Sequence, residues 1–307
     1  MTEEGRPQAG MAARARVYLD LTRAHFAPVW PVLFLAGLTL ASTRYPGLTW
    51  ALAGKAALIG LLGFEAGMVL NDIVDCRLDA RDVDPRFSRY WRPFGTRPLP
   101  AGLTPPSHAI ALFVVLVVAT SAVILTLPYP HSGYVGAIMV TSYALEVYYQ
   151  LKKRDQRFPI AQLVGRIDLA LFPVAGYLAL GFPDTTALLL FLVMYPWAEA
   201  HLGVNDLADL VNDRARGMKT IPVLFGIDGC IAWIGGFSLV HAGTAIALLL
   251  PLGSLTRAGF ATGLLLLAVA NLRIRKVRTP EAALGVLPLF HGSLLLYAMA
   301  LVLGSLL

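Results

Sequence analysis

Long apolar stretches constrain this 307-residue chain more than any other feature of its sequence. Several of them exceed the roughly 20 residues that a helix needs to cross about 30 Å of hydrocarbon. A bilayer offers no water to backbone polar groups, so only helices and closed barrels can span it. The stretches are continuous rather than alternating, and they therefore predict an all-α polytopic membrane protein. Composition agrees, because 57% of the residues are hydrophobic and only 14% are charged.

The apolar stretches predict nine transmembrane helices. We expect them at about 25–43, 51–76, 107–128, 132–150, 160–181, 185–210, 229–250, 255–272 and 281–306. Residues 1–19 are predicted to form a cytoplasmic N-terminal tail, disordered up to about Arg16, because this segment is polar and lacks the pattern of a signal peptide. Residues 20–307 are predicted to form a single transmembrane domain.

The basic residues lie almost wholly on one side of this predicted topology. That side holds the N-terminal tail and the loops after the second, fourth, sixth and eighth segments, whereas the other side has only Arg44, Lys55 and Arg257. Because cytoplasmic loops are rich in lysine and arginine, we expect the N-terminus on the cytoplasmic side of the cell membrane and the C-terminus on the outer side. The same distribution argues against a nucleic-acid-binding surface, although the formal net charge is +6.

An acidic motif occurs twice. Residues 65–79 and 199–213 both contain Glu-Ala and then, at the same offset, Asn-Asp-x-x-Asp-x-x-x-Asp. Each copy lies at the end of an even-numbered predicted helix, on the side of the membrane where the basic residues lie. The repeat therefore predicts two pseudo-equivalent halves of four helices, with a ninth helix added.

The motif residues share one face of a helix, since about 100° separates successive residues. The first copy presents Asn71, Asp72, Asp75 and Asp79, and the second presents Asn205, Asp206, Asp209 and Asp213. Six carboxylates at a membrane boundary repel one another and need cations. Oxygen ligands without thiolates suit Mg²⁺, which commonly bridges to phosphates. One copy alone would fit a solvated helix end, but eight of the 19 acidic residues lie in these two windows, which favours a functional site.

Basic residues on the same side are candidates for binding an anionic substrate. They are Arg23, Arg97, Lys152, Lys153, Arg154, Arg166 and Lys219. For most residues from Arg81 to Arg92 the structural alternative, a membrane-surface anchor, is the better interpretation, and for Lys152 and Arg154 the two are balanced. Arg166 lies within an apolar segment, where charge usually faces a cavity, although a structural pair with Asp168 is an alternative. His201 is predicted to be a packed polar residue.

Together these residues resemble the UbiA superfamily of intramembrane prenyltransferases. The similarity covers about residues 20–306 and rests on Asn71-Asp72-x-x-Asp75-x-x-x-Asp79, Asp209-x-x-x-Asp213, Arg97–Gly102, Tyr149-x-x-x-Lys153-Arg154 before Pro159, and Lys219–Pro222. Any one of these motifs is weak alone, and their combination is specific.

The resemblance implies Mg²⁺-dependent transfer of a prenyl group from an isoprenoid diphosphate, through an allylic carbocation, to a second substrate. It implies metal ligands at Asn71, Asp75, Asp209 and Asp213, and assistance to the leaving group from Arg97, Lys153 and Lys219. Further candidates for binding the diphosphate are Arg23, Asp72, Asp79, Tyr149, Lys152, Arg154, Arg166 and Asp206. Acceptors of the family are aromatic or lipid-like, which suggests quinone or ether-lipid synthesis.

Residues 80–96 form a longer loop than the family usually has, and we expect this loop to cap the site or to shape an acceptor pocket. Two alternative functions stay open at this stage. A membrane terpene cyclase of the same superfamily would release diphosphate without an acceptor. A transporter of an anionic substrate would explain two related halves, although its binding site would lie at the membrane midplane rather than at one face.

Overall fold

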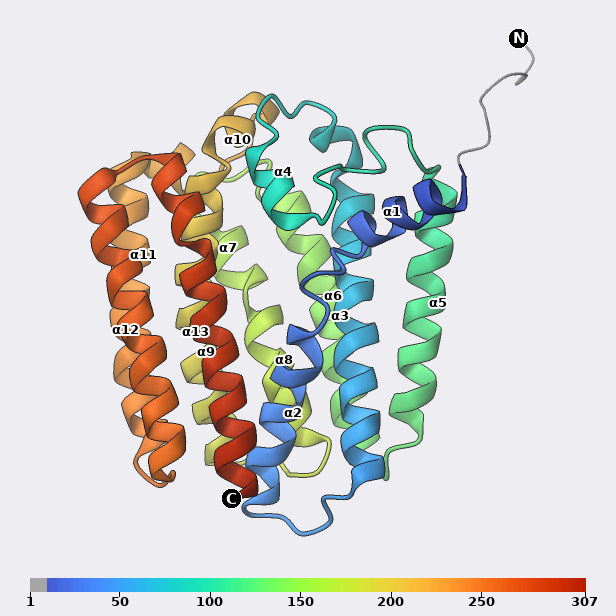
Figure 1. Cartoon of the computed structure of the whole chain (residues 1–307), viewed down its shortest axis with the longest axis vertical. Helices are drawn as coiled ribbons and strands as arrows, with labels where there is room; N and C mark the ends of the chain where they lie inside the picture. Colours follow the sequence, from blue (N-terminus) through green and yellow to red (C-terminus); the bar gives the residue numbers. More distant parts are fainter. Residues whose placement is uncertain (1–9) are drawn as a thin grey trace.

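The computed structural model describes residues 10–307, which fold into a bundle of α-helices (Figure 1). The described helices are α1 (Met11–Leu21), α2 (Val29–Ser42), α3 (Trp50–Asp79), α4 (Arg86–Trp91), α5 (Pro106–Leu125), α6 (His131–Lys152), α7 (Ile160–Gly165), α8 (Ile167–Leu178), α9 (Thr185–Ala208), α10 (Leu210–Arg216), α11 (Ile221–Leu249), α12 (Ser254–Val277) and α13 (Pro280–Leu306). The all-α prediction is confirmed.

Every predicted apolar segment overlaps a helix, but two details differ from the prediction. The segment at 160–181 is broken at Arg166, where α7 ends and α8 begins. The N-terminal tail was expected to be disordered up to about Arg16, which is wrong for residues 11–16 because they belong to α1. Residues 1–9 of the predicted tail lie outside the described residues.

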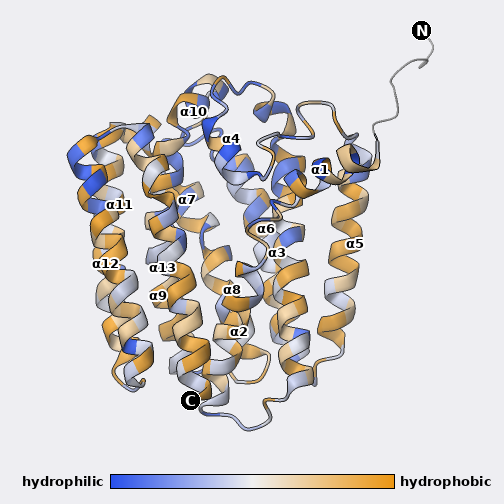
Figure 2. Ribbon diagram, in the orientation of Figure 1, coloured by the Kyte–Doolittle hydropathy of each residue, from blue (hydrophilic) through white to orange (hydrophobic). Residues whose placement is uncertain are grey.

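Seven helical stretches of the described chain are long and apolar enough to cross a membrane. They are α3, α5, the α7–α8 pair, α9, α11, α12 and α13. Orange, hydrophobic residues dominate the flanks of the bundle, while blue, hydrophilic residues gather at the end that carries α1, α4 and α10 (Figure 2). This finding does not test the number of nine transmembrane helices or the arrangement in two equivalent four-helix halves. Both stay predictions.

The bundle encloses a central space between six helices. Around it, α2 packs on α3, α3 on α6, α6 on α8, α8 on α9, α9 on α13, and α13 on α2. Helices α5, α11 and α12 lie outside this ring against α3, α9 and α13. Side chains from all six inner helices line one cavity.

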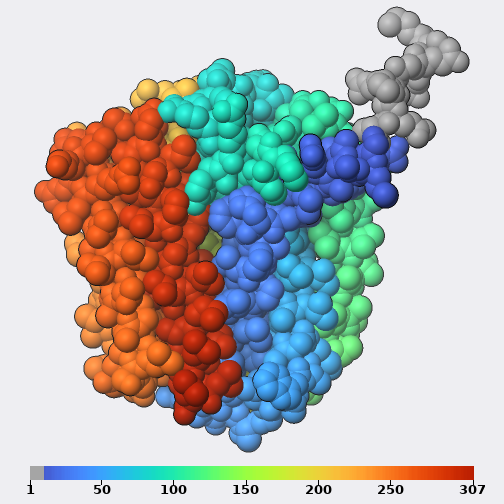
Figure 3. Space-filling view, viewed as in Figure 1, coloured from blue at the N-terminus to red at the C-terminus, as the bar shows by residue number. Residues whose placement is uncertain are grey.

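The loop after α3 covers this end of the bundle. Residues 80–105, drawn in teal, lie across the tops of the inner helices, and α4 is part of them (Figures 1 and 3). Phe87, Ser88, Trp91, Arg92 and Arg97 of this segment line the cavity. In the space-filling view the surface is hollowed below this loop, between α2 and α13 (Figure 3).

Candidate active site

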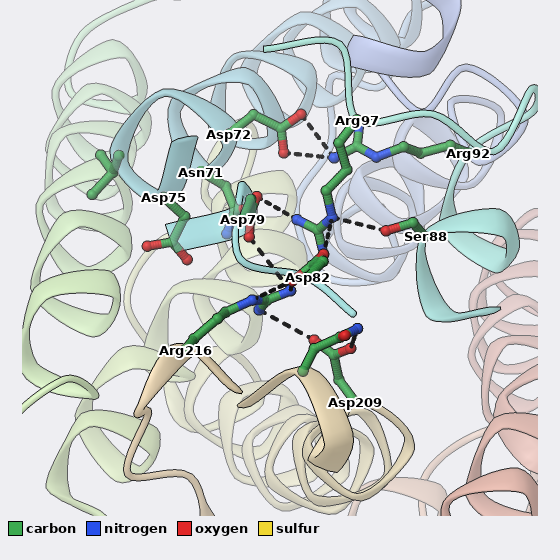
Figure 4. A network of polar contacts seen from close by, with 12 residues as sticks. Asn71, Asp72, Asp75, Asp79, Asp82, Ser88, Arg92, Arg97, Asp209 and Arg216 are labelled. Atoms are coloured by element: carbon green, nitrogen blue, oxygen red, sulfur yellow. Dashed lines mark hydrogen bonds and ion pairs between the residues drawn. The ribbon is translucent and has the colours of Figure 1, made fainter. Parts of the chain in front are cut away.

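The first acidic motif lies in the last turns of α3. Asp72, Asp75 and Asp79 are each no more than 5% exposed, and Asp75, Asp79 and Asn71 line the cavity (Figure 4). The Asn71 side-chain amide donates to Glu146 Oε1 at 2.8 Å, which fixes its orientation. This motif keeps the helical geometry that its spacing predicts.

Asp72 does not line the cavity, because it faces two arginines instead. Arg92 Nη2 donates to both of its carboxylate oxygens at 2.8 Å, and Arg23 Nη2 donates to Oδ1 at 3.0 Å. Arg92 also donates to the backbone oxygen of Asp20. A buried carboxylate is costly unless it is paired. Asp72 therefore fastens the loop after α3 and the α1–α2 junction to α3.

The second acidic motif is divided by a break in the chain. α9 ends at Ala208 and α10 begins at Leu210, so Asp209 lies between the two helices with φ −98° and ψ 9°. The prediction that the whole motif lies on one continuous helix is wrong. The break still leaves Asp206, Asp209 and Asp213 on the cavity, each no more than 6% exposed.

Arg216 joins the two motifs. Its guanidinium lies 3.2 Å from Asp209, 3.5 Å from Asp79 and 3.7 Å from Asp213, and it also pairs with Asp82 (Figure 4). The position follows from local structure, because Gly217 ends α10 in the left-handed conformation (φ 75°) and turns the chain back after Arg216. Sequence reasoning treated Arg216 as a loop cation. Its spacing of three residues from Asp213 is the signal that would have found it.

Arg97 and Lys153 occupy the positions that the sequence suggested. Arg97 pairs with Asp79, and its Nε donates to Ser88 Oγ at 2.8 Å. Lys153 Nζ donates to Asp75 Oδ2 at 2.8 Å, and Arg154 Nη2 lies 3.1 Å from Asp75 Oδ1. The cavity end that holds the carboxylates is thus also lined with cations.

A second polar layer lies deeper, around Tyr149. The Lys153 ammonium and the Arg166 guanidinium each lie 4.8 Å from the centre of its ring, a favourable arrangement for a cation and an aromatic face. Arg166 is 3.3 Å from Glu146 and 3.5 Å from Asp168. The prediction that Arg166 faces a cavity is confirmed, and its pairing with Asp168 is also present.

The structure does not bring Lys152 or Lys219 to the cavity. Both are exposed, and the Lys219 backbone N–H donates to the Lys153 backbone oxygen at 2.8 Å, while its side chain does not line the site. Thr220 and Arg216 line the cavity from this turn instead. Adjacent lysines are indistinguishable by composition, and only the helix geometry separates Lys153 from Lys152.

Two histidines that sequence reasoning did not select also line the cavity. His201 of α9 was expected to be a packed polar residue, and it is 8% exposed but faces the cavity beside His291 of α13. Each is a lone imidazole in an apolar helix, where ionisable groups are costly. The cost of placing an imidazole in an apolar helix is the sequence signal that would have pointed to both histidines.

The donor set suits a hard divalent cation, since Asn71, Asp75, Asp209 and Asp213 supply only oxygen ligands. Within residues 10–307, however, no three His, Cys, Asp or Glu side chains lie close enough together to hold a metal ion. Lys153, Arg154 and Arg216 neutralise these carboxylates in this arrangement. The oxygen atoms of these four residues fit Mg²⁺ in their chemistry. To bind the metal, the carboxylates would have to give up their ion pairs with lysine and arginine.

Asp209 and Asp213 lie at the end of the bundle, outside the long apolar helices. Burial, together with the charge of Asp213, raises the pKa of Asp209 to about 7. Burial and the charge of Asp206 raise the pKa of Asp213 to about 7. Both carboxyl groups thus need a nearby cation to stay ionised near neutral pH.

Comparison with known sequences gives a consistent result. A family model described as the UbiA prenyltransferase family matches residues 29–294. The chain is 30% identical to 4-hydroxybenzoate octaprenyltransferase of Alkalilimnicola ehrlichii over 87% of each chain. It is 31% identical to protoheme IX farnesyltransferase of Aquifex aeolicus over 68% of each chain. These relatives differ in the acceptor that their names specify.

Solved structures share the fold. A UbiA homologue from Aeropyrum pernix K1 has a TM-score of 0.69 at 22% identity, covering 88% of this chain and 96% of that one. A UbiA homologue from Archaeoglobus fulgidus, bound to GPP and Mg²⁺, has a TM-score of 0.63 at 14% identity, covering 93% and 99%. The fold agrees over nearly the whole of each chain.

Proposed function

This chain belongs to the UbiA prenyltransferase family and is a prenyltransferase, and we propose that it transfers a prenyl group from an isoprenoid diphosphate to an aromatic or lipid-like acceptor. The observation that carries the proposal is the meeting of both acidic motifs and a set of lysine and arginine side chains in one cavity, whose remaining wall is lined largely by apolar and aromatic side chains. Such a cavity suits a substrate with a diphosphate head and a hydrocarbon tail.

The head of the substrate belongs at the charged end. Mg²⁺ would be held there by Asn71, Asp75, Asp209 and Asp213, and when bound it neutralises the charge of the diphosphate. A homologue of the same fold binds GPP and Mg²⁺, which is consistent with a metal-dependent reaction in this chain. Arg97, Lys153 and Arg216 donate hydrogen bonds to the leaving diphosphate as the carbon–oxygen bond breaks, and Arg216 takes the part that sequence reasoning gave to Lys219.

The tail belongs in the apolar depth of the cavity. Side chains of α2, α3 and α8 line this part, among them Phe34, Ile59, Phe64, Leu169 and Phe172. These groups exclude water from the allylic cation, so that a bound acceptor rather than water captures it. Aromatic faces such as that of Trp197 also stabilise positive charge.

The chain is proposed to lie in the cell membrane with this site on the cytoplasmic side. The end of the bundle that carries the site also carries most exposed lysine and arginine residues, as cytoplasmic loops do. Isoprenoid diphosphates are charged, so a site open to the aqueous compartment that holds them suits the reaction.

The proposal is tested by measuring diphosphate release from geranylgeranyl diphosphate by the purified protein, with Mg²⁺ or with EDTA, across a panel of acceptors. We expect release that requires both Mg²⁺ and one acceptor class. Asp75→Asn and Asp209→Asn should each lose at least about 100-fold in rate, because each removes an ionised ligand of the leaving-group site. Release without any acceptor would instead identify a cyclase, and metal-independent uptake into vesicles would identify a transporter.

A further inference from the structure

A line of hydrogen-bonded side chains lies in the cavity wall below the acidic motifs, and the function proposed above does not use it. Tyr90 Oη is 2.7 Å from His291 Nδ1, and His291 Nε2 is 2.9 Å from His201 Nε2. The three residues come from α4, α13 and α9. Both histidines line the cavity, so the line ends where a substrate can reach it.

The short contact between the imidazoles restricts their protonation. Two ring nitrogens 2.9 Å apart form a hydrogen bond only if one carries a proton and the other a lone pair. The pair therefore holds at most one extra proton. With the Tyr90 hydroxyl as a further donor or acceptor, the three groups can take up one proton and share it along the line.

The histidine pair lies about two helical turns deeper in the bundle than the second acidic motif. His201, Asn205 and Asp209 follow each other at intervals of four residues, so they succeed one another along one face towards the end of α9. At 1.5 Å per residue, His201 lies about 6 Å deeper than Asn205 and about 12 Å deeper than Asp209. A diphosphate bound at Asp209 with its tail in the cavity would place its reactive carbon in the intervening layer.

The surroundings of the pair suit a flat ring with a hydroxyl group. The His201 ring is stacked on Trp197 with centroids 4.9 Å apart and planes at 12°, and Trp91 meets the His291 ring edge-on at 5.1 Å. The buried side-chain oxygen of Asn205 has no hydrogen-bond partner among the described residues. A donor group of a bound molecule, other than the hydroxyl that loses its proton, would satisfy this oxygen, and a planar ring would stack on the aromatic wall.

We propose that the wall formed by Trp91, His201, Asn205 and His291 binds the acceptor, a planar ring that bears a hydroxyl group, and that His201 takes the proton of this hydroxyl. His291 and Tyr90 are positioning residues, which orient His201 and share its proton. This inference rests on the proposed prenyl transfer and names its acceptor class and its base.

The Nδ1 lone pair of His201, whose Nε2 faces His291, takes the hydroxyl proton in place of the 3.3 Å contact with the Asn205 amide nitrogen. The electrons of that O–H bond move into the ring. A ring carbon forms a bond to the allylic carbon, whose bond to oxygen breaks with its electron pair on the diphosphate. The ring carbon then loses its hydrogen as a proton, which leaves with the diphosphate, and His201 returns its proton to the ring oxygen.

The test compares His201→Gln, His291→Gln and Tyr90→Phe with the wild type, and uses His108→Gln, an exposed histidine of α5, as the control. Geranylgeranyl diphosphate is the donor, and 4-hydroxybenzoate, a dihydroxynaphthoate and a prenylglycerol phosphate are the acceptors. We expect wild-type turnover with a ring acceptor. His201→Gln should lose roughly 10²–10⁴-fold in kcat, the usual contribution of a general base, without a change in KM for the donor. Tyr90→Phe should lose less, and His108→Gln nothing.

A second measurement separates a base from a merely structural residue. Fluorinated ring acceptors have a more acidic hydroxyl and need a base less, so the ratio of wild-type to His201→Gln turnover should fall as acceptor acidity rises. A constant ratio, a loss confined to the donor KM, or transfer only to the prenylglycerol phosphate would overturn the inference while leaving prenyl transfer intact. No diphosphate release by the wild type with any acceptor would overturn the proposed function as well. If His201→Gln does not fold, Tyr90→Phe, which lacks one oxygen, serves for the same comparison.

Discussion

At the residue scale, Arg216 links the two acidic motifs of the site. It is buried, with its side chain 4% exposed, and it contacts carboxylates of both acidic motifs. Arg216→Ala leaves the buried carboxylates of Asp209 and Asp213 without a paired cation, which typically costs about 3–5 kcal/mol. We expect a lower thermal unfolding midpoint in detergent and diphosphate release reduced at least 100-fold.

The control for this prediction is Arg214→Ala. Arg214 lies on the same short helix but is exposed, so its removal should change neither quantity appreciably. Equal effects of the two substitutions would mean that the net charge of α10, rather than the placement of Arg216, matters.

Lys152 and Lys153 provide a second matched comparison. Lys153 Nζ is hydrogen-bonded to Asp75 in the cavity, whereas Lys152 is exposed. Lys153→Ala removes a donor to the leaving group and should reduce kcat about 10²–10³-fold, while Lys152→Ala should stay within twofold of the wild type. Steady-state kinetics with the preferred acceptor measure both. Similar losses in the two variants would indicate a general electrostatic effect of this loop.

The candidate site could be predicted in part because its charges are expensive in a membrane. Carboxylates and arginines in an apolar chain need partners, and this reasoning located Asp75, Asp79, Arg97 and Arg166 on the cavity. It could not separate Lys219 from Arg216, because their order around the cavity depends on the turn at Gly217 rather than on spacing along a helix. It also missed His291, whose partner His201 is 90 residues away in the sequence.

At the scale of elements, the long helices were predictable and their breaks were not. Apolar length alone requires helices in a bilayer, which gives α3, α9 and α13. The break at Arg166 directly follows Gly165, whereas the break at Asp209 has no glycine or proline beside it. Arg166 and Asp209 both make ion pairs inside the bundle, and such tertiary contacts are not visible in the local sequence.

The crossing of α2 and α8 gives a prediction about packing. Gly37 and Gly176 face the opposite helix so closely that a Cβ atom on either would overlap a backbone oxygen, that of Pro173 or of Phe34. Small residues commonly permit such close approach between membrane helices. Gly37→Ala and Gly176→Ala should each destabilise the protein by more than about 3 kcal/mol, because backbone atoms cannot move aside as side chains do.

The thermal unfolding midpoint in detergent measures this effect. Gly54→Ala is the control, since Gly54 lies within α3 with open space around its Cβ position, and there alanine should stabilise the helix by up to about 1 kcal/mol. If all three variants unfold at the wild-type temperature, α2 and α8 do not approach as closely as described.

At the scale of the whole molecule, the two ends of the bundle differ in character. One end carries the loop of residues 80–105, α10 and the acidic motifs, and the other consists of short connections (Figures 1 and 2). The cavity joins the charged end to the apolar interior, so one enclosure receives both the polar and the hydrocarbon part of a substrate. This asymmetry makes the orientation in the membrane a functional property.

The orientation can be tested with single cysteines in a chain whose own Cys76 and Cys230 are replaced by serine and alanine. Arg81→Cys marks the charged end, and Tyr129→Cys marks the opposite end, where Tyr129 is 89% exposed. Because lysine and arginine are retained on the cytoplasmic side, a membrane-impermeant maleimide should label Tyr129→Cys in intact cells and Arg81→Cys only in inverted vesicles or after permeabilisation. Both variants should be labelled fully in detergent, which controls for accessibility. The opposite pattern would place the site on the outer face, where the donor diphosphate would have to be supplied from outside the cell.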